Sequence, residues 1–88
     1  MTIPVLINSS GSGSSWIPVK GLKTIRVQGM QPGDVLDFKL YDPKLNHQVR
    51  RLTIYESGDF DEFLKGVIKL RVKHFSTAMN PRVSVDLV

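Results

Sequence analysis

The chain has 88 residues, a net charge of +4 and no cysteine, which predicts a single small domain without disulfide bonds or thiolate metal sites. No apolar run approaches the roughly 20 residues that a membrane-spanning helix requires. The first residues also lack the basic start of a secretory signal peptide. We therefore expect no membrane association, and synthesis and retention in the cytoplasm.

The charges are unevenly distributed along the sequence. Residues 1–33 carry three bases and no acid, residues 34–62 carry seven acids and four bases, and residues 63–88 carry five bases and one acid. A protein that binds nucleic acid rarely has an acidic block in its middle. Charges of both signs suit docking between copies or onto another protein, because complementary charge fixes the register of such contacts.

The chain begins with a short apolar strand followed by a polar run. Ile3, Val5 and Ile7 share one face, and Pro4 restricts the strand to an edge because proline cannot donate a ladder hydrogen bond. Residues 8–15 are small and polar, so we interpret residues 1–15 as a β-arm on a flexible tether, ahead of a domain over residues 16–88. The arm is predicted to pair with a sheet edge of a neighbouring subunit; the alternative is a first strand paired within its own sandwich.

Five further segments alternate apolar and polar residues with the period of a β-strand: 23–28, 35–42, 48–55, 67–75 and 82–88. Turn sequences separate them, including Pro32-Gly33, which is typical of a type II turn. Only residues 59–65 could form a helical turn. The apolar positions of the strands form the predicted core: Ile25, Val27, Leu36, Phe38, Leu40, Leu52, Ile54, Ile68, Leu70, Val72, Val83, Val85 and Leu87.

Several short strands with one apolar face each must pair those faces. The sequence therefore predicts an all-β fold, a single small antiparallel β-sandwich (jelly-roll or immunoglobulin-like) or a barrel, with an N-terminal β-arm. Parallel packing is disfavoured because crossover helices are missing.

The sequence offers little for catalysis or for metal binding. His47 lies in a predicted loop, His74 continues the inward face of its strand, and no nucleophile elbow accompanies them. The acidic cluster of Asp59, Asp61 and Glu62 lacks the spacing of a calcium loop. We therefore predict that the chain is not an enzyme and needs no cofactor, and that the acidic cluster is a solvated loop or a patch for a basic partner.

The most prominent feature outside the predicted core is a basic row on one strand. Lys69, Arg71 and Lys73 share a face, and we expect Arg26 and Arg51 on neighbouring strands to extend it. A solvated sheet face is one interpretation. The others are a protein contact, with the acidic cluster of a second copy as partner, and a nucleic-acid surface, which would require interleaved aromatic residues.

Trp16 follows the polar run directly. A core position and an interface anchor are both open for this tryptophan.

The order of these features resembles a known class of protein. A Ser/Gly-rich segment, "SWIPV", "IRVQG", "PGDVLDF", "IKLRVKHF" and "PRVSVDLV" together are similar in layout to the small β-sandwich proteins of tailed-phage virions, especially capsid decoration (cement) proteins. The resemblance implies a non-enzymatic protein present in many copies, located on the capsid surface at junctions between major capsid protein subunits and often forming a homo-oligomer. It transfers no catalytic residue.

Three other functions stay open at this point. A tail or head–tail component of the virion would have the same general build. A carbohydrate-binding module is disfavoured by the single tryptophan. A nucleic-acid-binding β-domain is favoured by the basic row and disfavoured by the acidic middle block.

Overall fold

The computed structural model of the chain describes residues 2–5, 10–45, 49–61, 63–77 and 81–88. The strands and the one short helix within them are β1 (Ile3–Val5), β2 (Ser10–Gly13), β3 (Ile17–Pro18), β4 (Thr24–Gln28), β5 (Asp34–Tyr41), the 3-10 helix η1 (Pro43–Leu45), β6 (Val49–Ile54), β7 (Gly58–Asp61), β8 (Lys69–Ser76) and β9 (Ser84–Leu87).

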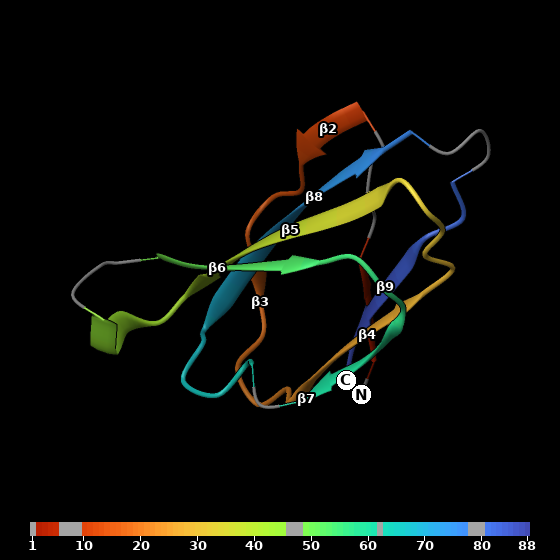
Figure 1. Ribbon diagram of the computed structural model, residues 1–88. Coiled ribbons are helices and arrows are strands. Elements are labelled where there is room, and N and C mark those ends of the chain that lie inside the picture. Colours follow the sequence, from red (N-terminus) through yellow and green to blue (C-terminus); the bar gives the residue numbers. More distant parts are fainter. Residues whose placement is uncertain (1, 6–9, 46–48, 62, 78–80) are drawn as a thin grey trace.

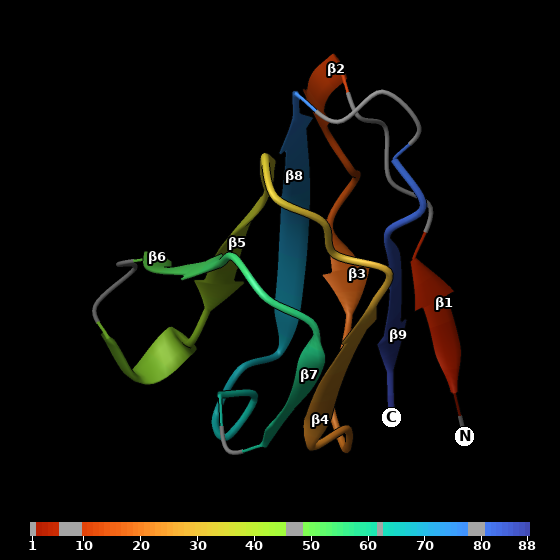
Figure 2. The same cartoon turned by 45° about the vertical axis from the view of Figure 1, so that its right-hand side comes forward.

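The strands form two antiparallel sheets that pack against each other (Figures 1 and 2). The four-stranded sheet has the order β1-β9-β4-β7. The five-stranded sheet has the order β2-β8-β5-β6, with β3 also paired to β8. The predicted all-β antiparallel sandwich is therefore confirmed.

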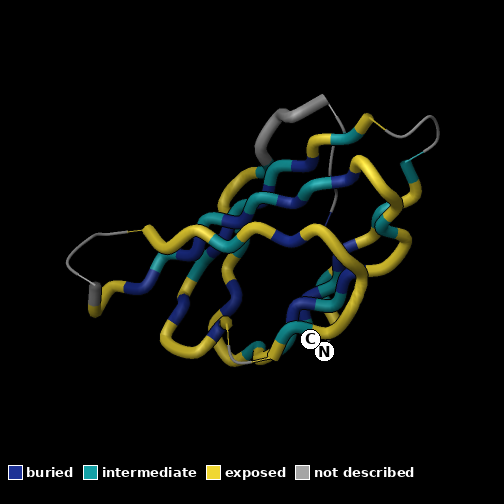
Figure 3. The backbone as a smooth tube through the Cα atoms, in the orientation of Figure 1, coloured by how far each residue is buried: buried dark blue, intermediate teal, exposed yellow. Residues whose placement is uncertain are grey.

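The core lies between the sheets, where the buried positions of both face each other (Figure 3). Strand β5 shows why the sequence folds this way, because its residues alternate strictly between buried and half-buried. Phe38, at the middle of this strand, is fully buried. Ten of the predicted core residues are buried: Ile25, Val27, Leu36, Phe38, Leu40, Ile54, Leu70, Val72, Val85 and Leu87. Two more, Leu52 and Val83, are half-buried and pack against this cluster.

One predicted core residue is misplaced and four core residues were not predicted. Ile68 is 40% exposed because it precedes β8, at the end of the sandwich where the opposite sheet does not cover it. The core instead gains residues from β1 and from the loops at this end: Val5, Val19, Leu64 and Val67. Val19 and Leu64 sit outside the alternating segments, and Val5 lies in the strand assigned to the arm. Val67 lies in the segment 67–75 but on the face opposite its predicted apolar positions, so periodicity gave no reason to include any of the four.

The N-terminal strand pairs within its own chain, which is the second of the two arrangements that the sequence left open, and not the pairing with a neighbouring subunit. In the antiparallel pair of β1 with β9, Ile3 lies opposite Leu87 and Val5 opposite Val85. Val5 is buried and Ile3 packs against the core. Pro4 is tolerated because β1 is the edge of its sheet. This pairing packs two residues of the apolar row, Ile3 and Val5, against the core, and the third, Ile7, lies outside the described residues.

Part of the polar run, within the described residues 10–15, forms regular structure. Ser10–Gly13 forms strand β2, which pairs with β8. Ser14 continues the pairing, since its N–H donates to the carbonyl of Val72 and its Oγ accepts from the N–H of Val72. Small residues therefore cover the edge of β8 with backbone contacts.

The one helical turn that the sequence allowed, at residues 59–65, is not seen in the described residues of that range, and the short helix η1 lies at Pro43–Leu45 instead. The predicted Pro32-Gly33 turn is confirmed. Residues 58–61 form β7, and turns follow at 63–66. At the other site, Gly33 has a φ of 96° and the N–H of Asp34 donates to the carbonyl of Gln31.

Candidate interaction surface

Strand β8 directs its side chains to two different environments. Leu70, Val72 and His74 are buried, while the alternate residues Lys69, Arg71 and Lys73 point to the outer face of the five-stranded sheet and are half-buried. The predicted shared face of the three bases is therefore confirmed.

Neighbouring strands enlarge this row to five bases. Lys39 of β5 lies directly opposite Arg71, and Arg51 of β6 lies opposite Lys39. Residues directly opposite each other on antiparallel strands share a face. We call this set the basic face: Lys39, Arg51, Lys69, Arg71 and Lys73. The acid that strand register adds to the same face is Asp37, opposite Lys73.

Aromatic rings lie among these bases. The Nζ of Lys69 is 4.9 Å from the ring centre of Trp16 and 4.9 Å from that of Tyr41, within the range of a cation–π contact. The guanidinium carbon of Arg71 is 5.7 Å from the Trp16 ring. Trp16 is therefore not a core residue: it is 37% exposed and packs on the bases of the outer face.

Arg71 is half-buried beside the ring of Trp16. Its Nε is buried and has no hydrogen-bond partner among the described residues. The cation–π contact with Trp16 provides partial compensation for this atom. The aliphatic part of the Arg71 side chain therefore serves as packing surface as well as a charge.

Three acidic residues lie on the outer face of the four-stranded sheet. Asp59 of β7 accepts from the Nε of Arg26 at 3.0 Å and from its Nη2 at 3.3 Å. Asp61 accepts from the Oγ1 of Thr24 at 2.6 Å. Asp86 of β9 lies opposite Arg26 in strand register. We call Asp59, Asp61 and Asp86 the acidic face.

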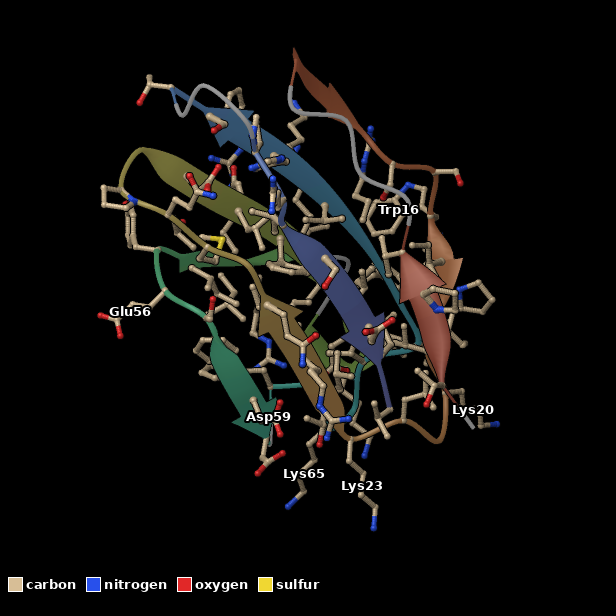
Figure 4. The ribbon with its side chains drawn as sticks, turned by 90° about the vertical axis from the view of Figure 1, so that its right-hand side faces the viewer. Trp16, Lys20, Lys23, Glu56, Asp59 and Lys65 are labelled. Carbon is tan, nitrogen blue, oxygen red and sulfur yellow. The ribbon has the colours of Figure 1, made fainter. Side chains whose placement is uncertain are left out.

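Arg26 belongs to the acidic face, so its expected place beside Lys69 is wrong. The hydrogen bond that Arg26 donates to Asp59, and then the negative charge of Asp59, raise the pKa of Arg26, with smaller contributions from Asp86 and Asp61. The third predicted acid, Glu62, lies outside the described residues. Trp16 and Asp59 lie well apart in the side-chain view (Figure 4).

His74 has a structural partner that the sequence did not indicate. Its Nε2 lies 2.9 Å from the Oδ1 of Asp34, and both side chains are almost fully buried. Burial alone would raise the pKa of Asp34, but hydrogen bonds from Ser76, His74 and the N–H of Gln31 outweigh it and lower that pKa. The pair joins β5 to β8 beneath the sheet surface.

The structure offers no metal site among the residues it describes, where no group of three or more metal-binding side chains comes together. His47 lies outside the described residues. Within the described parts of the chain, no helix is long and apolar enough to cross a membrane.

Comparison of the chain with protein-family models, with curated proteins and with solved structures finds no match.

Proposed function

We propose that the chain is a non-enzymatic structural protein that assembles through its charged sheet faces. The observation that carries the proposal is the segregation of charge: five bases gather on one outer sheet face and three acids on the other. A molecule with opposite charges on opposite faces attracts further copies in one orientation, and also an acidic surface of a larger partner.

The geometry favours a head-to-tail contact over a symmetric pair. A basic face repels the same face of a second copy, which disfavours a two-fold contact through it. A contact between the basic face of one copy and the acidic face of the next is heterologous, and such contacts form rings or open arrays. Proteins that cover a repeating lattice use contacts of this kind.

The resemblance to tailed-phage decoration proteins extends the proposal to a specific setting. In that setting the chain covers the capsid surface, and its basic face binds an acidic surface of the major capsid protein. The small sandwich and the charge segregation are compatible with this role, and a tail or head–tail position would use the same faces.

Charge reversal tests the proposal directly. R51E/K73E reverses two bases of the basic face that are not opposite each other in register, and D59K/D61K reverses two acids. We expect the wild-type chain to associate at low salt in sedimentation velocity, each variant to stay monomeric, and an equimolar mixture of the two variants to associate. A monomeric wild-type chain that also fails to co-sediment with capsids would overturn the proposal.

Single-stranded nucleic acid is a second candidate ligand, and one specific observation favours it. Trp16 and Tyr41 flank Lys69, which is the interleaving of rings and bases that nucleic-acid platforms use. The ring faces are partly occupied by the lysine itself, and Asp37 interrupts the bases, so we rank this function second. Micromolar binding to a random oligonucleotide, with affinity that falls steeply with salt, would place it first.

A further inference from the structure

A cleft of about 680 Å³ opens at the end of the sandwich where β4 begins and β7 ends. Its walls are two four-residue turns that share a sequence pattern: Val-Lys-Gly-Leu at residues 19–22 and Leu-Lys-Gly-Val at residues 64–67. In each turn the fourth N–H donates to the first carbonyl, and the glycine has a positive φ, 89° for Gly21 and 80° for Gly66. This is the arrangement of a type II turn, with lysine at its exposed corner.

The two turns are fixed side by side. The N–H of Val19 donates to the carbonyl of Ile68 at 3.0 Å, which joins the residues that flank the turns. Val19, Leu64 and Val67 are buried in the core, so both turns are anchored from below. The walls of the cleft are therefore preformed.

The lining of the cleft combines an apolar floor with a cationic rim. Leu22, Leu64, Val67 and Ile68 contribute the apolar part. The exposure of Ile68, which contradicts its predicted core position, is explained by its place in this cleft.

Three exposed lysines, Lys20, Lys23 and Lys65, belong to the same lining and project from the same end of the molecule (Figure 4). No ion pair of the described residues includes any of them. The described acid of the lining is Asp61, which accepts from Thr24. The rim is therefore cationic and not neutralised from within.

We infer that this cleft binds a small amphipathic anion, a carboxylate or similar head group with an aliphatic or aromatic body. The volume is in the range of small-molecule sites, roughly 300–1,000 Å³, and such sites are mostly apolar with a few polar groups that fix orientation. The lysines would hold the head group, and the floor would bury the body.

The backbone around the cleft argues against a peptide strand as the occupant. The N–H groups of Leu22, Lys23 and Thr24 donate to carbonyls of the chain, and those of Val67 and Ile68 do the same. A peptide that adds as a strand needs a row of free backbone groups. Recognition here must come from apolar contact and from the lysine head groups.

The test uses decanoate below its micelle-forming concentration, with binding followed by amide chemical shifts in nuclear magnetic resonance. We expect a dissociation constant on the order of 1 mM for a ligand of this size. The shifts should concentrate on residues 19–24 and 64–68. Acetate, which lacks the body, and octyl glucoside, which lacks the charge, should each bind at least about tenfold more weakly.

Matched variants separate the rim from general charge. K20Q/K65Q removes the two turn lysines and should weaken decanoate binding about three- to tenfold. K44Q/R82Q removes two exposed bases that lie outside the cleft lining, and should leave binding unchanged. I68S removes an exposed part of the floor and should also weaken binding, which tests the apolar contribution independently of charge.

Several outcomes would overturn the inference. These are equal binding of octyl glucoside, equal loss in K44Q/R82Q and K20Q/K65Q, or shifts that map elsewhere on the sandwich. Binding of an acidic peptide at these residues without binding of decanoate would assign the cleft to a protein partner instead. None of these readouts depends on assembly through the sheet faces.

Discussion

The two outer sheet faces are built on the same kind of scaffold but differ in how their charges are held. On the five-stranded sheet, bases lie opposite bases, such as Lys39 between Arg71 and Arg51, and the charge is left for an external partner. On the four-stranded sheet, Arg26 lies between Asp59 and Asp86, so part of the charge is satisfied internally. The basic face is therefore more available for binding than the acidic face.

The largest expected effect is a loss of stability, from a substitution in the core on which both sheets pack. Phe38 is fully buried between the sheets, and F38A should cost about 3–5 kcal/mol of the free energy of unfolding through lost apolar contact and the cavity left behind. Urea denaturation followed by far-ultraviolet circular dichroism measures this loss. The matched variant T53A, on the exposed side of β6, should change stability by less than about 0.5 kcal/mol. Equal effects would contradict the assigned core.

The next effect distinguishes a buried acid from an exposed one. The folded pKa of Asp34 is lowered below its unfolded value of about 3.9, so its contribution to stability is present above that pH and is lost as the pH falls through the folded pKa. We expect D34N to cost about 1–3 kcal/mol at neutral pH. The difference in the free energy of unfolding between the wild type and D34N should therefore shrink as the pH falls.

Denaturation midpoints of wild type and D34N, measured from neutral pH to about pH 2, give the pH dependence. D59N on the acidic face is the control, because Asp59 is exposed and its ion pair among the described residues is with Arg26, whose side chain is 43% exposed. A difference between wild type and D34N that stays constant with pH would refute the role given to the Asp34 charge.

A smaller effect concerns the tryptophan of the basic face. W16A removes a half-exposed ring and its cation–π contact with Lys69. It should lower the free energy of unfolding by about 1 kcal/mol. Because Trp16 is the single tryptophan, its fluorescence also reports the local potential. Iodide should quench it more strongly than caesium does, and added salt should reduce the difference. Equal quenching by the two ions would mean that the bases do not dominate this surface.

The smallest effect is expected at Arg26. Its pair with Asp59 is exposed to solvent, so R26Q should change the melting temperature less than W16A does. Its consequence should appear in assembly instead, because R26Q leaves the acidic face more negative and should strengthen head-to-tail association at low salt. Sedimentation velocity of R26Q beside the wild type checks this, and weaker association of R26Q would count against the proposed contact.

Local sequence patterns were enough to predict the fold class and the orientation of most strand residues. Alternation with period 2 is a local property, so it placed Phe38 inside and Lys69 outside without knowledge of any partner strand. It also placed His74 on the buried side of β8. Turn chemistry worked at Pro32-Gly33 for the same reason, because φ preferences act within a few residues.

The order of the strands in each sheet, and therefore which charged residues gather on the same sheet face, could be read only from the tertiary structure. Arg26 and Arg51 are equivalent in the sequence pattern, yet one joins the acidic face and the other the basic face, because strand order is set by contacts between distant segments. Three other features depend on the same long-range packing. They are the hydrogen bond between His74 and Asp34, the pairing of β1 with β9, and the contact between the two Lys-Gly turns. Periodicity reports which side a residue faces, but only the assembled sandwich determines what it faces.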